Sequence, residues 1–317
     1  MNRAMSNEHF YRSVQMVLGD PDAAFSRTIT SAFFARGMRD LSVCTDADQL
    51  RKAVNSQVDI VLCDVAIPKS DFCEISQDIR HGRIGGNPFT VLIAMTGGAT
   101  QDDVARVLKS GVDDLIFKPA EAEAVVSRIG AFARRRNPFV VTPGYIGPTR
   151  RDARRNDGSD DDVIEVPNTL RAKVVQSGRA ADLQSLVESG VSGLNEKKAQ
   201  SGLRVICRLA RRVVQQESGP AHAAEARRTL GMLANKADEL MLEHRSAATT
   251  RHVAAIAERI SRLARRGEKA PGEPSLVELN LLLQLSDAAL AAFLTAGRSS
   301  GLVPEIVAVV EEYLGRN

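Results

Sequence analysis

Four short apolar stretches near the N-terminal end each run directly into a polar residue that can do chemistry. The polar residues are two carboxylates, a hydroxyl and an ammonium group, namely Asp20, Asp64, Thr96 and Lys118. Carboxylates act as nucleophiles and bind hard divalent cations, and an ammonium group neutralises a transferred anion. Residues that end parallel strands meet at the carboxyl edge of the sheet, where open α/β folds place their sites. We therefore expect these side chains to form one site.

The apolar stretches themselves indicate buried strands. The central one, residues 60–63, is rich in β-branched residues, and a turn signal follows it at Pro68, as expected of a strand buried on both faces. The other predicted strands are residues 14–19, 41–43, 90–95 and 114–117. Helical patterns alternate with them at residues 23–36, 47–55, 71–80, 102–110 and 120–135. This alternation predicts an α/β fold with a doubly wound, five-stranded parallel sheet.

The polar residues also occur in a familiar order. The pattern consists of Asp20, Asp64 with Pro68 and Asp71 behind it, Thr96-Gly97, Gly111 and Lys118-Pro119. In this order and spacing, about the first 135 residues resemble the response-regulator receiver domain of two-component signalling. The resemblance implies a flavodoxin-like fold with strand order 2-1-3-4-5.

The resemblance also implies a role for each site residue. Asp64 is expected to accept a phosphoryl group from a histidine kinase or phosphotransfer protein. Mg²⁺ is the expected cofactor, with Asp20, Asp64 and the backbone carbonyl of Ala66 as ligands. Lys118 would neutralise a phosphoryl oxygen, and the Thr96 hydroxyl would bond to the attached group. We expect no enzyme activity beyond phosphorylation and dephosphorylation of the protein itself.

The sequence departs from the family pattern in three places. The family has two adjacent acids after its first strand. Aligning Phe25 as a core residue of the first helix makes Asp20 the first acid and puts Pro21 in the second place. Asp22, one position late, is a further candidate ligand. Phe72 replaces a usual glycine, and Leu115 replaces the usual aromatic switch residue. These departures leave a second hypothesis open, a degenerate receiver that acts as an unphosphorylated scaffold.

Length and composition shifts predict four segments. At 317 residues the chain suits two domains. We expect a lead-in at residues 1–12, a receiver domain at 13–135, a linker rich in Pro, Gly, Arg and Asp at 136–165, and an all-helical output or interaction domain at 166–317. Prolines and glycines argue against long regular elements in the linker. Its short apolar patches, residues 139–141 and 145–146, remain candidates for docking on a domain.

The C-terminal half shows helical periodicity. Three stripes at helical spacing predict amphipathic helices that pack as an all-α bundle. They are Leu203, Ile206, Ala210 and Val213; Leu230, Leu233, Ala237 and Leu240; and Val253, Ile256, Ile260 and Leu263. Only a weak break at residues 246–250 separates the second stripe from the third, so one long helix or two are both compatible. Further helices are expected at residues 276–294 and 303–314.

The sequence leaves three functions open for this half. A protein-interaction or self-association module is favoured by the apolar stripes. DNA binding is the alternative, motivated by Arg208, Arg211, Arg212, Arg227, Arg228, Arg262, Arg265 and Arg266, but no helix-turn-helix pattern accompanies them. A phosphotransfer bundle would use His222, His244 or His252, and the Lys and Gly that follow the histidine in that family are missing. The half contains no HExxH, GxSxG or P-loop motif.

Composition and charge fit an ordinary globular protein in a reducing cytoplasm. Hydrophobic residues make up 44% of the chain and the formal net charge is +3. We expect no membrane association, since no apolar run approaches the roughly 20 residues that span a bilayer and the N-terminus has no apolar core of a signal peptide. The cysteines form no CxxC pair and are expected to be small buried hydrophobes. They are Cys44, Cys63, Cys73 and Cys207.

Overall fold

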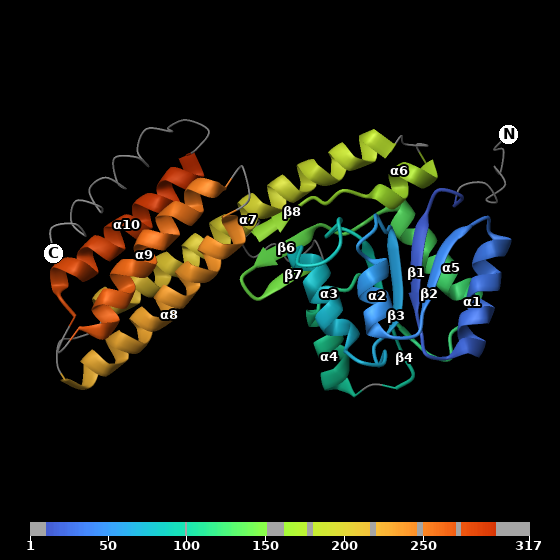
Figure 1. The fold of residues 1–317 in the computed structure, drawn as a ribbon, viewed down its shortest axis with the longest axis horizontal. Helices are drawn as coiled ribbons and strands as arrows, with labels where there is room; N and C mark the ends of the chain where they lie inside the picture. Colours follow the sequence, from blue (N-terminus) through green and yellow to red (C-terminus); the bar gives the residue numbers. More distant parts are fainter. Residues whose placement is uncertain are drawn as a thin grey trace. The chain divides into compact units, whose positions relative to one another are not determined.

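The computed structural model describes residues 11–98, 100–150, 162–175, 180–215, 220–245, 250–270 and 274–295 (Figure 1). The chain divides between Val191 and Ser192 into two compact units, the N-terminal unit and the C-terminal unit. Most of the expected lead-in and the helix expected at residues 303–314 lie outside the described residues. In the part of the chain that is described, no helix is both long and apolar enough to cross a membrane.

A five-stranded parallel sheet forms the centre of the N-terminal unit. Its strands are β1 (Gln15–Gly19), β2 (Asp40–Cys44), β3 (Ile60–Asp64), β4 (Val91–Thr96) and β5 (Asp114–Phe117). Their spatial order is β2-β1-β3-β4-β5, and every neighbouring pair is parallel. The expected fold class is thereby confirmed. Because all strands run the same way, the residues that end them lie along one edge.

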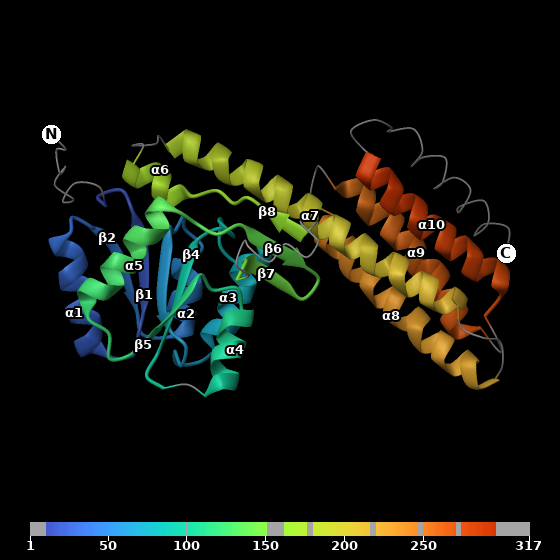
Figure 2. The ribbon, with the colours of Figure 1, turned by 180° about the vertical axis from the view of Figure 1, so that it is seen from behind.

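Helices cover both faces of the sheet (Figures 1 and 2). They are α1 (Ala23–Ala35), α2 (Ala47–Ala53), α3 (Phe72–His81), α4 (Gln101–Lys109) and α5 (Ala122–Arg134). Side chains of α1 and α5 share one hydrophobic core with Met16 and Leu18 of β1. Side chains of α2, α3 and α4 share a second core with Val17 of the same strand. Alternate residues of β1 thus face opposite cores, as a strand buried on both faces requires.

The expected linker at residues 136–165 is corrected by the structure in its described part. Strands β6 (Phe139–Thr142), β7 (Tyr145–Pro148) and β8 (Val163–Ile164) form an antiparallel sheet in the order β7-β6-β8. Phe139 and Val141 are fully buried and Ile146 nearly so. The apolar patches therefore outweigh the prolines and glycines, and Pro148 is tolerated because it ends an edge strand. The acidic and basic run at 151–161 lies outside the described residues.

A buried ionic cluster connects the hairpin formed by β6 and β7 to the five-stranded parallel sheet. Arg80, at the end of α3, is fully buried and donates over 2.7 Å to Asp113, which directly precedes β5. Arg136 donates to the other oxygen of Asp113, also over 2.7 Å. The guanidinium groups of Arg80 and Arg136 both lie against the ring of Phe139. The first residue of β6 is thus held between two cations that share one carboxylate.

The predicted start of the helical domain at residue 166 is also corrected. Helix α6 (Thr169–Val175) belongs to the N-terminal unit, where Leu170 joins the core of α1 and α5. Lys173 of α6 donates to the buried carboxylate of Asp59 over 2.6 Å. Helix α7 (Ala180–Gln215) begins in the same unit, and the boundary between the units falls within it. A helical pattern alone does not tell which unit a helix packs in.

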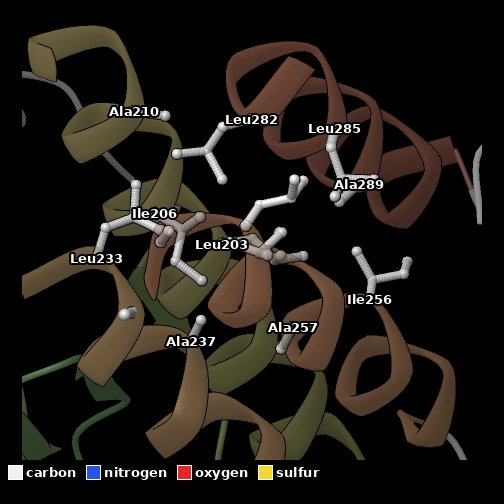
Figure 3. Close-up of a cluster of buried hydrophobic side chains, with 14 of the residues drawn as sticks. Leu203, Ile206, Ala210, Leu233, Ala237, Ile256, Ala257, Leu282, Leu285 and Ala289 are labelled. Carbon is white, nitrogen blue, oxygen red and sulfur yellow. The ribbon is translucent and has the colours of Figure 1, made fainter. Parts of the chain in front are cut away.

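Four helices share one core in the described part of the C-terminal unit. They are the remainder of α7, α8 (Pro220–His244), α9 (Arg251–Lys269) and α10 (Leu276–Thr295). All three predicted apolar stripes are buried in this core, which Figure 3 shows in part. The second and third stripes lie on separate helices that pack closely against each other. A Cβ on Gly231 of α8 would come 2.7 Å from Glu268 of α9. The expected all-α fold of this half is confirmed.

Candidate functional site

Three of the predicted side chains meet at the carboxyl edge of the parallel sheet. The ammonium group of Lys118 lies 2.5 Å from a carboxylate oxygen of Asp20 and 2.5 Å from one of Asp64. The Asp20 side chain is fully buried, whereas that of Asp64 keeps 13% of its surface exposed. Asp64 is therefore the carboxylate that a reactant from solution can reach. Lys118 thereby connects the ends of β1 and β3, two of the strands that were expected to carry the site.

The charge of Lys118 is secured by its partners. Burial on its own would lower the pKa of Lys118, but the hydrogen bonds to Asp20 and Asp64 outweigh it and raise the pKa above its usual value. The group is therefore an ammonium cation across the whole physiological pH range. Two carboxylates and one ammonium give this edge of the sheet a net negative formal charge, which favours a further cation.

Asp22, the further candidate ligand, lies at the N-terminus of α1. Its carboxylate caps α1 by accepting hydrogen bonds from the backbone N–H groups of Ala24 and Phe25 at 2.8 and 3.2 Å. These bonds, that of Phe25 first, lower the pKa of Asp22. The backbone N–H of Asp22 donates to Asp20 over 2.8 Å. The backbone of Asp22 thus bonds to Asp20, while its carboxylate bonds to the first turn of α1.

Thr96 and Ala66 border the same edge. The Thr96 hydroxyl donates to the carbonyl of Gly98 over 2.9 Å, while the Thr96 carbonyl accepts from the backbone of Lys118 over 2.7 Å. The backbone N–H of Ala66 donates to Asp64 over 2.8 Å. The structure therefore joins Thr96 to Lys118 through the backbone, and its hydroxyl is turned to its own loop. A side-chain rotation would be needed to bring that hydroxyl to a group on Asp64.

The donor set is compatible with Mg²⁺. Mg²⁺ is bound through one or two carboxylates, keeps several waters and needs oxygen donors. Asp20 and Asp64 supply two carboxylates, and the exposed backbone at Ala66 supplies a carbonyl oxygen. Within the described residues, no cluster of three or more His, Cys, Asp or Glu side chains that could hold a metal occurs. A cation here would thus rely on these few protein oxygens and on water.

Two further residues of the site region were not predicted to contact it, and one of them, Phe25, was expected only as a core residue of the first helix. The ring of Phe25 lies against the Lys118 ammonium group, with 4.7 Å between the nitrogen and the ring centroid. Lys69, in the loop after Asp64, has a left-handed backbone with φ of 73°. Its ammonium group donates to Asp46 and Asp48 at 2.9 and 3.0 Å and so ties the loop to α2. No motif predicts either contact, because both join residues that are distant in sequence.

The departures from the family pattern have clear places in the fold. Phe72, the first residue of α3, is fully buried in the core under α2, α3 and α4. Leu115 is partly buried against the same core. Asp71 caps α3 and pairs with Arg106 of α4. The loop after Asp64 is therefore anchored by an apolar side chain where the family usually has a flexible glycine.

The part of the chain that contains this edge matches a known family. The sequence model of the family described as response regulator receiver domain matches residues 17–130. This part of the chain is a receiver domain. The match contains Asp20, Asp64, Thr96 and Lys118, and the strand order is the one expected for the receiver domain.

Three curated relatives each match between 27% and 36% of this chain. The response regulator ArlR of Staphylococcus saprophyticus subsp. saprophyticus is 34% identical over 86 residues, 27% of this chain and 37% of that protein. The two-component response regulator PhoP of Pseudomonas aeruginosa is 32% identical over 114 residues, 36% of this chain and 48% of that protein. Histidine kinase 1 of Arabidopsis thaliana is 33% identical over 87 residues, 27% of this chain and 7% of that protein. The chain thus spans less than half the length of these relatives.

Solved structures similar to the receiver domain include the BeF3-activated receiver domain of DrrB. It is 20% identical with a TM-score of 0.35, and the match covers 38% of this chain and 98% of that one. The receiver domain of the sensor histidine kinase PA1611 from Pseudomonas aeruginosa, solved with a coordinated magnesium ion, is 24% identical with a TM-score of 0.32. That match covers 37% of this chain and 94% of the other.

Proposed function

We propose that this chain is a two-component response regulator whose receiver domain accepts a phosphoryl group on Asp64. The contact of one ammonium group, Lys118, with both Asp20 and Asp64 carries the proposal. A partly exposed carboxylate lies beside an ammonium group at the edge of the parallel sheet, which supports a role for Asp64 as the nucleophile. Electrostatic stabilisation by such preorganised groups is the main requirement of phosphoryl transfer.

The proposed step transfers a phosphoryl group from a phosphohistidine to Asp64. A carboxylate oxygen of Asp64 forms a bond to phosphorus while the P–N bond of the donor's phosphohistidine breaks. The electron pair of that bond stays on the imidazole, which takes up a proton from water. The product is an acyl phosphate. Bound Mg²⁺ would neutralise phosphoryl oxygens, held by Asp20, Asp64 and the carbonyl of Ala66, and Lys118 would pair with another oxygen. Asp20 itself receives no phosphoryl group, because its side chain is fully buried.

We propose a histidine kinase or a phosphotransfer protein as the donor. The likeness to proteins named response regulators, ArlR and PhoP, supports this role. A similar segment also occurs in a protein named histidine kinase, in which it makes up 7% of the length. Receiver segments therefore accompany kinases as well as response regulators among these relatives.

For the C-terminal unit we propose a protein partner or self-association as the output. Four of the eight arginines that motivated DNA binding form ion pairs between neighbouring helices. Arg212 joins α7 to α8, Arg265 joins α9 to α8, Arg266 joins α9 to α10, and Arg211 joins α7 to α10. Each acidic partner neutralises the positive field that phosphate backbones require. His244, a candidate of the phosphotransfer alternative, is fully buried, so it is closed to a phosphoryl donor.

Contacts within the N-terminal unit connect the site, through α4 and β5, to the segment after β7. Phosphorylation adds roughly −1.5 to −2 charge, and Thr96 and Lys118 are the nearest groups able to respond. They end β4 and β5, next to α4. Arg150, just after β7, donates to the carbonyl groups of Leu108 at the end of α4 and of Val112 before β5. We propose that a packing change along α4 and β5 reaches the hairpin through this contact.

The test is phosphorylation by a small donor. Incubation with acetyl phosphate and Mg²⁺ is expected to add one phosphoryl group, measured by intact mass. The Asp64→Asn variant is expected to lose it, and Asp103→Asn, which alters an exposed cap of α4, is expected to keep it. An unlabelled wild-type protein, under conditions that label another receiver, would reject the proposal and favour an unphosphorylated scaffold.

The output is tested on the same samples. Size measurement with and without the donor, together with hydrogen exchange, is expected to show a change of oligomeric state or altered protection in residues 102–117 and in the C-terminal unit. No change outside residues 17–130 and a constant size would reject coupling. Sequence-specific DNA binding at physiological salt would replace the protein partner by DNA.

A further inference from the structure

The Lys118 ammonium group has a third neighbour besides its two carboxylates. Its nitrogen lies 4.7 Å from the centroid of the Phe25 ring, within the roughly 6 Å at which the electron-rich face of an aromatic ring attracts a cation. The Lys118 side chain is 17% exposed. Two carboxylates and one ring face thus surround the cation, and little water reaches it. Such attraction is strongest where water is excluded.

The loop between β1 and α1 fixes where the ring stands. One oxygen of Asp20 accepts from the backbone N–H of Asp22, and the other accepts from Lys118. The Asp22 carboxylate in turn accepts from the backbone N–H of Phe25 over 3.2 Å. Two hydrogen bonds from backbone N–H groups to carboxylates therefore link Asp20 to Phe25 by way of Asp22. Asp20 is thus bonded directly to the ammonium group and, through Asp22, is linked to the backbone of Phe25.

Phosphorylation changes the neighbours of Lys118 unequally. When Asp64 becomes an acyl phosphate, its carboxylate charge is lost to the new bond, and Lys118 has to exchange that contact for a phosphoryl oxygen. Phe25 takes no part in the bond, so its attraction for the cation persists. We propose that Phe25 is a positioning residue that holds the Lys118 ammonium group in the site while this exchange occurs. The role in transfer rests on the proposed function of Asp64.

A purely structural role for Phe25 makes a different prediction. Phe25 is partly buried and packs against the core of α1 and α5. If it only filled space, leucine would replace it without effect on the site. Phe25→Leu therefore removes the ring and keeps an apolar side chain, whereas Phe25→Tyr keeps the ring and serves as the matched control. Equal thermal unfolding of the variants and the wild type would show that the fold is unchanged.

The first readout does not depend on phosphorylation. Lysine labelled with ¹³C gives an NMR signal for the protons next to the Lys118 nitrogen, assigned by its loss in Lys118→Arg. A ring face shifts such protons upfield. We expect an upfield shift in the wild type and in Phe25→Tyr, and its loss in Phe25→Leu. An unshifted signal in the wild type itself overturns the inference, even if no variant folds.

The second readout is the labelling rate with saturating acetyl phosphate and Mg²⁺. Here a carboxylate oxygen of Asp64 displaces acetate, which leaves with the electron pair of the broken P–O bond. Phe25→Leu is expected to label about tenfold more slowly, equivalent to ~1.4 kcal/mol, and Phe25→Tyr within about twofold of the wild type. Equal rates for leucine and wild type would overturn the inference. An unlabelled wild type would instead reject the proposed function, and the NMR result would then decide alone whether Phe25 holds Lys118.

Discussion

Arg136 and Asp113 form an ion pair of 2.7 Å in which both side chains are only 3% exposed. The arginine lies just after α5, in the segment that was expected to be a linker, and the aspartate directly precedes β5. The second oxygen of Asp113 accepts from Arg80 and from the backbone N–H of Leu92. One buried carboxylate thus connects α3, two strands of the parallel sheet and the entry to the hairpin.

Removing this carboxylate is expected to destabilise the N-terminal unit strongly. Asp113→Asn leaves two buried guanidinium groups without a counter-charge, a loss of about 3–5 kcal/mol in the free energy of unfolding. Asp78 is the matched control, since it also accepts from two arginines, Arg51 and Arg83, but is 22% exposed. Asp78→Asn should cost no more than about 1 kcal/mol. Urea unfolding measures both, and equal losses would contradict the role of burial.

The same pair predicts a pH dependence. Burial would raise the pKa of Asp113, but the guanidinium groups of Arg136 and Arg80 outweigh it and hold the pKa below its usual value. A lowered folded-state pKa gives stability that is complete above the unfolded-state pKa of about 3.9 and is lost as the pH falls through the folded-state pKa. The stability difference between wild type and Asp113→Asn should be constant near neutrality and shrink in acid. A difference that grows on acidification would have the wrong sign.

Gly111 is expected to tolerate no side chain, because β7 passes directly over it. Its φ is +88°, and a Cβ would lie 2.3 Å from the carbonyl oxygen of Ile146. Gly82 has a similar φ of +72° with nothing within 4 Å. Gly82→Ala should therefore cost only the left-handed strain, about 1–2 kcal/mol. Gly111→Ala should add overpacking of about 1–3 kcal/mol. Thermal unfolding compares the two variants. Equal losses of stability would show that β7 can move away from residue 111 without an energetic penalty.

Two glycines of α7, three residues apart, are expected to respond oppositely to alanine. A Cβ on Gly190 would lie 2.4 Å from Pro167 and 2.8 Å from the ring of Phe89, whereas Gly193 is exposed with nothing within 4 Å. Gly193→Ala should stabilise the protein by about 0.5–1 kcal/mol through helix propensity. Gly190→Ala should destabilise it. Changes of the same sign in urea unfolding would mean that close packing at Gly190 is unimportant.

Mg²⁺ binding is expected to depend on Asp20 and hardly on Asp22. Asp20→Asn removes a buried carboxylate from the pocket and should weaken binding by at least about tenfold, as loss of groups at metal sites does. Asn is itself a good helix N-cap, so Asp22→Asn should preserve α1 and bind nearly as well as the wild type. Calorimetric titration of the two variants measures this. Similar losses in both would make Asp22 a ligand.

Much of the fold followed from apolar patterning. Residues 60–63 and 90–95 were recognised as strands because a strand buried on both faces reads as a continuous apolar run. The residues that end these strands then had to meet at one edge, and Lys118 does contact Asp20 and Asp64 there. The stripes of the C-terminal half were equally informative, since long helices with one apolar face are the most periodic of elements.

The features that the sequence did not predict are buried charges and contacts between residues distant in the chain. Arg80 and Arg136 were not expected inside the protein, because arginine is usually exposed and becomes buried only with partners that a single sequence does not identify. The hairpin was missed for a related reason. Gly147 and Pro148 signal a turn in isolation, yet the glycine lets β7 approach Gly111 closely. The unit boundary inside α7 leaves no mark, because one helical pattern continues through it.

The hairpin changes what counts as a complete folding unit. A fragment that ended at residue 135, just past the family match at residues 17–130, would keep Asp20, Asp64 and Lys118 in the sequence. It would nevertheless remove Arg136 from Asp113 and the Phe139 ring from Arg80, and it would expose apolar surface that the hairpin now covers. Limited proteolysis should therefore release a resistant core that extends beyond the receiver domain through α6, and a shorter recombinant piece should aggregate.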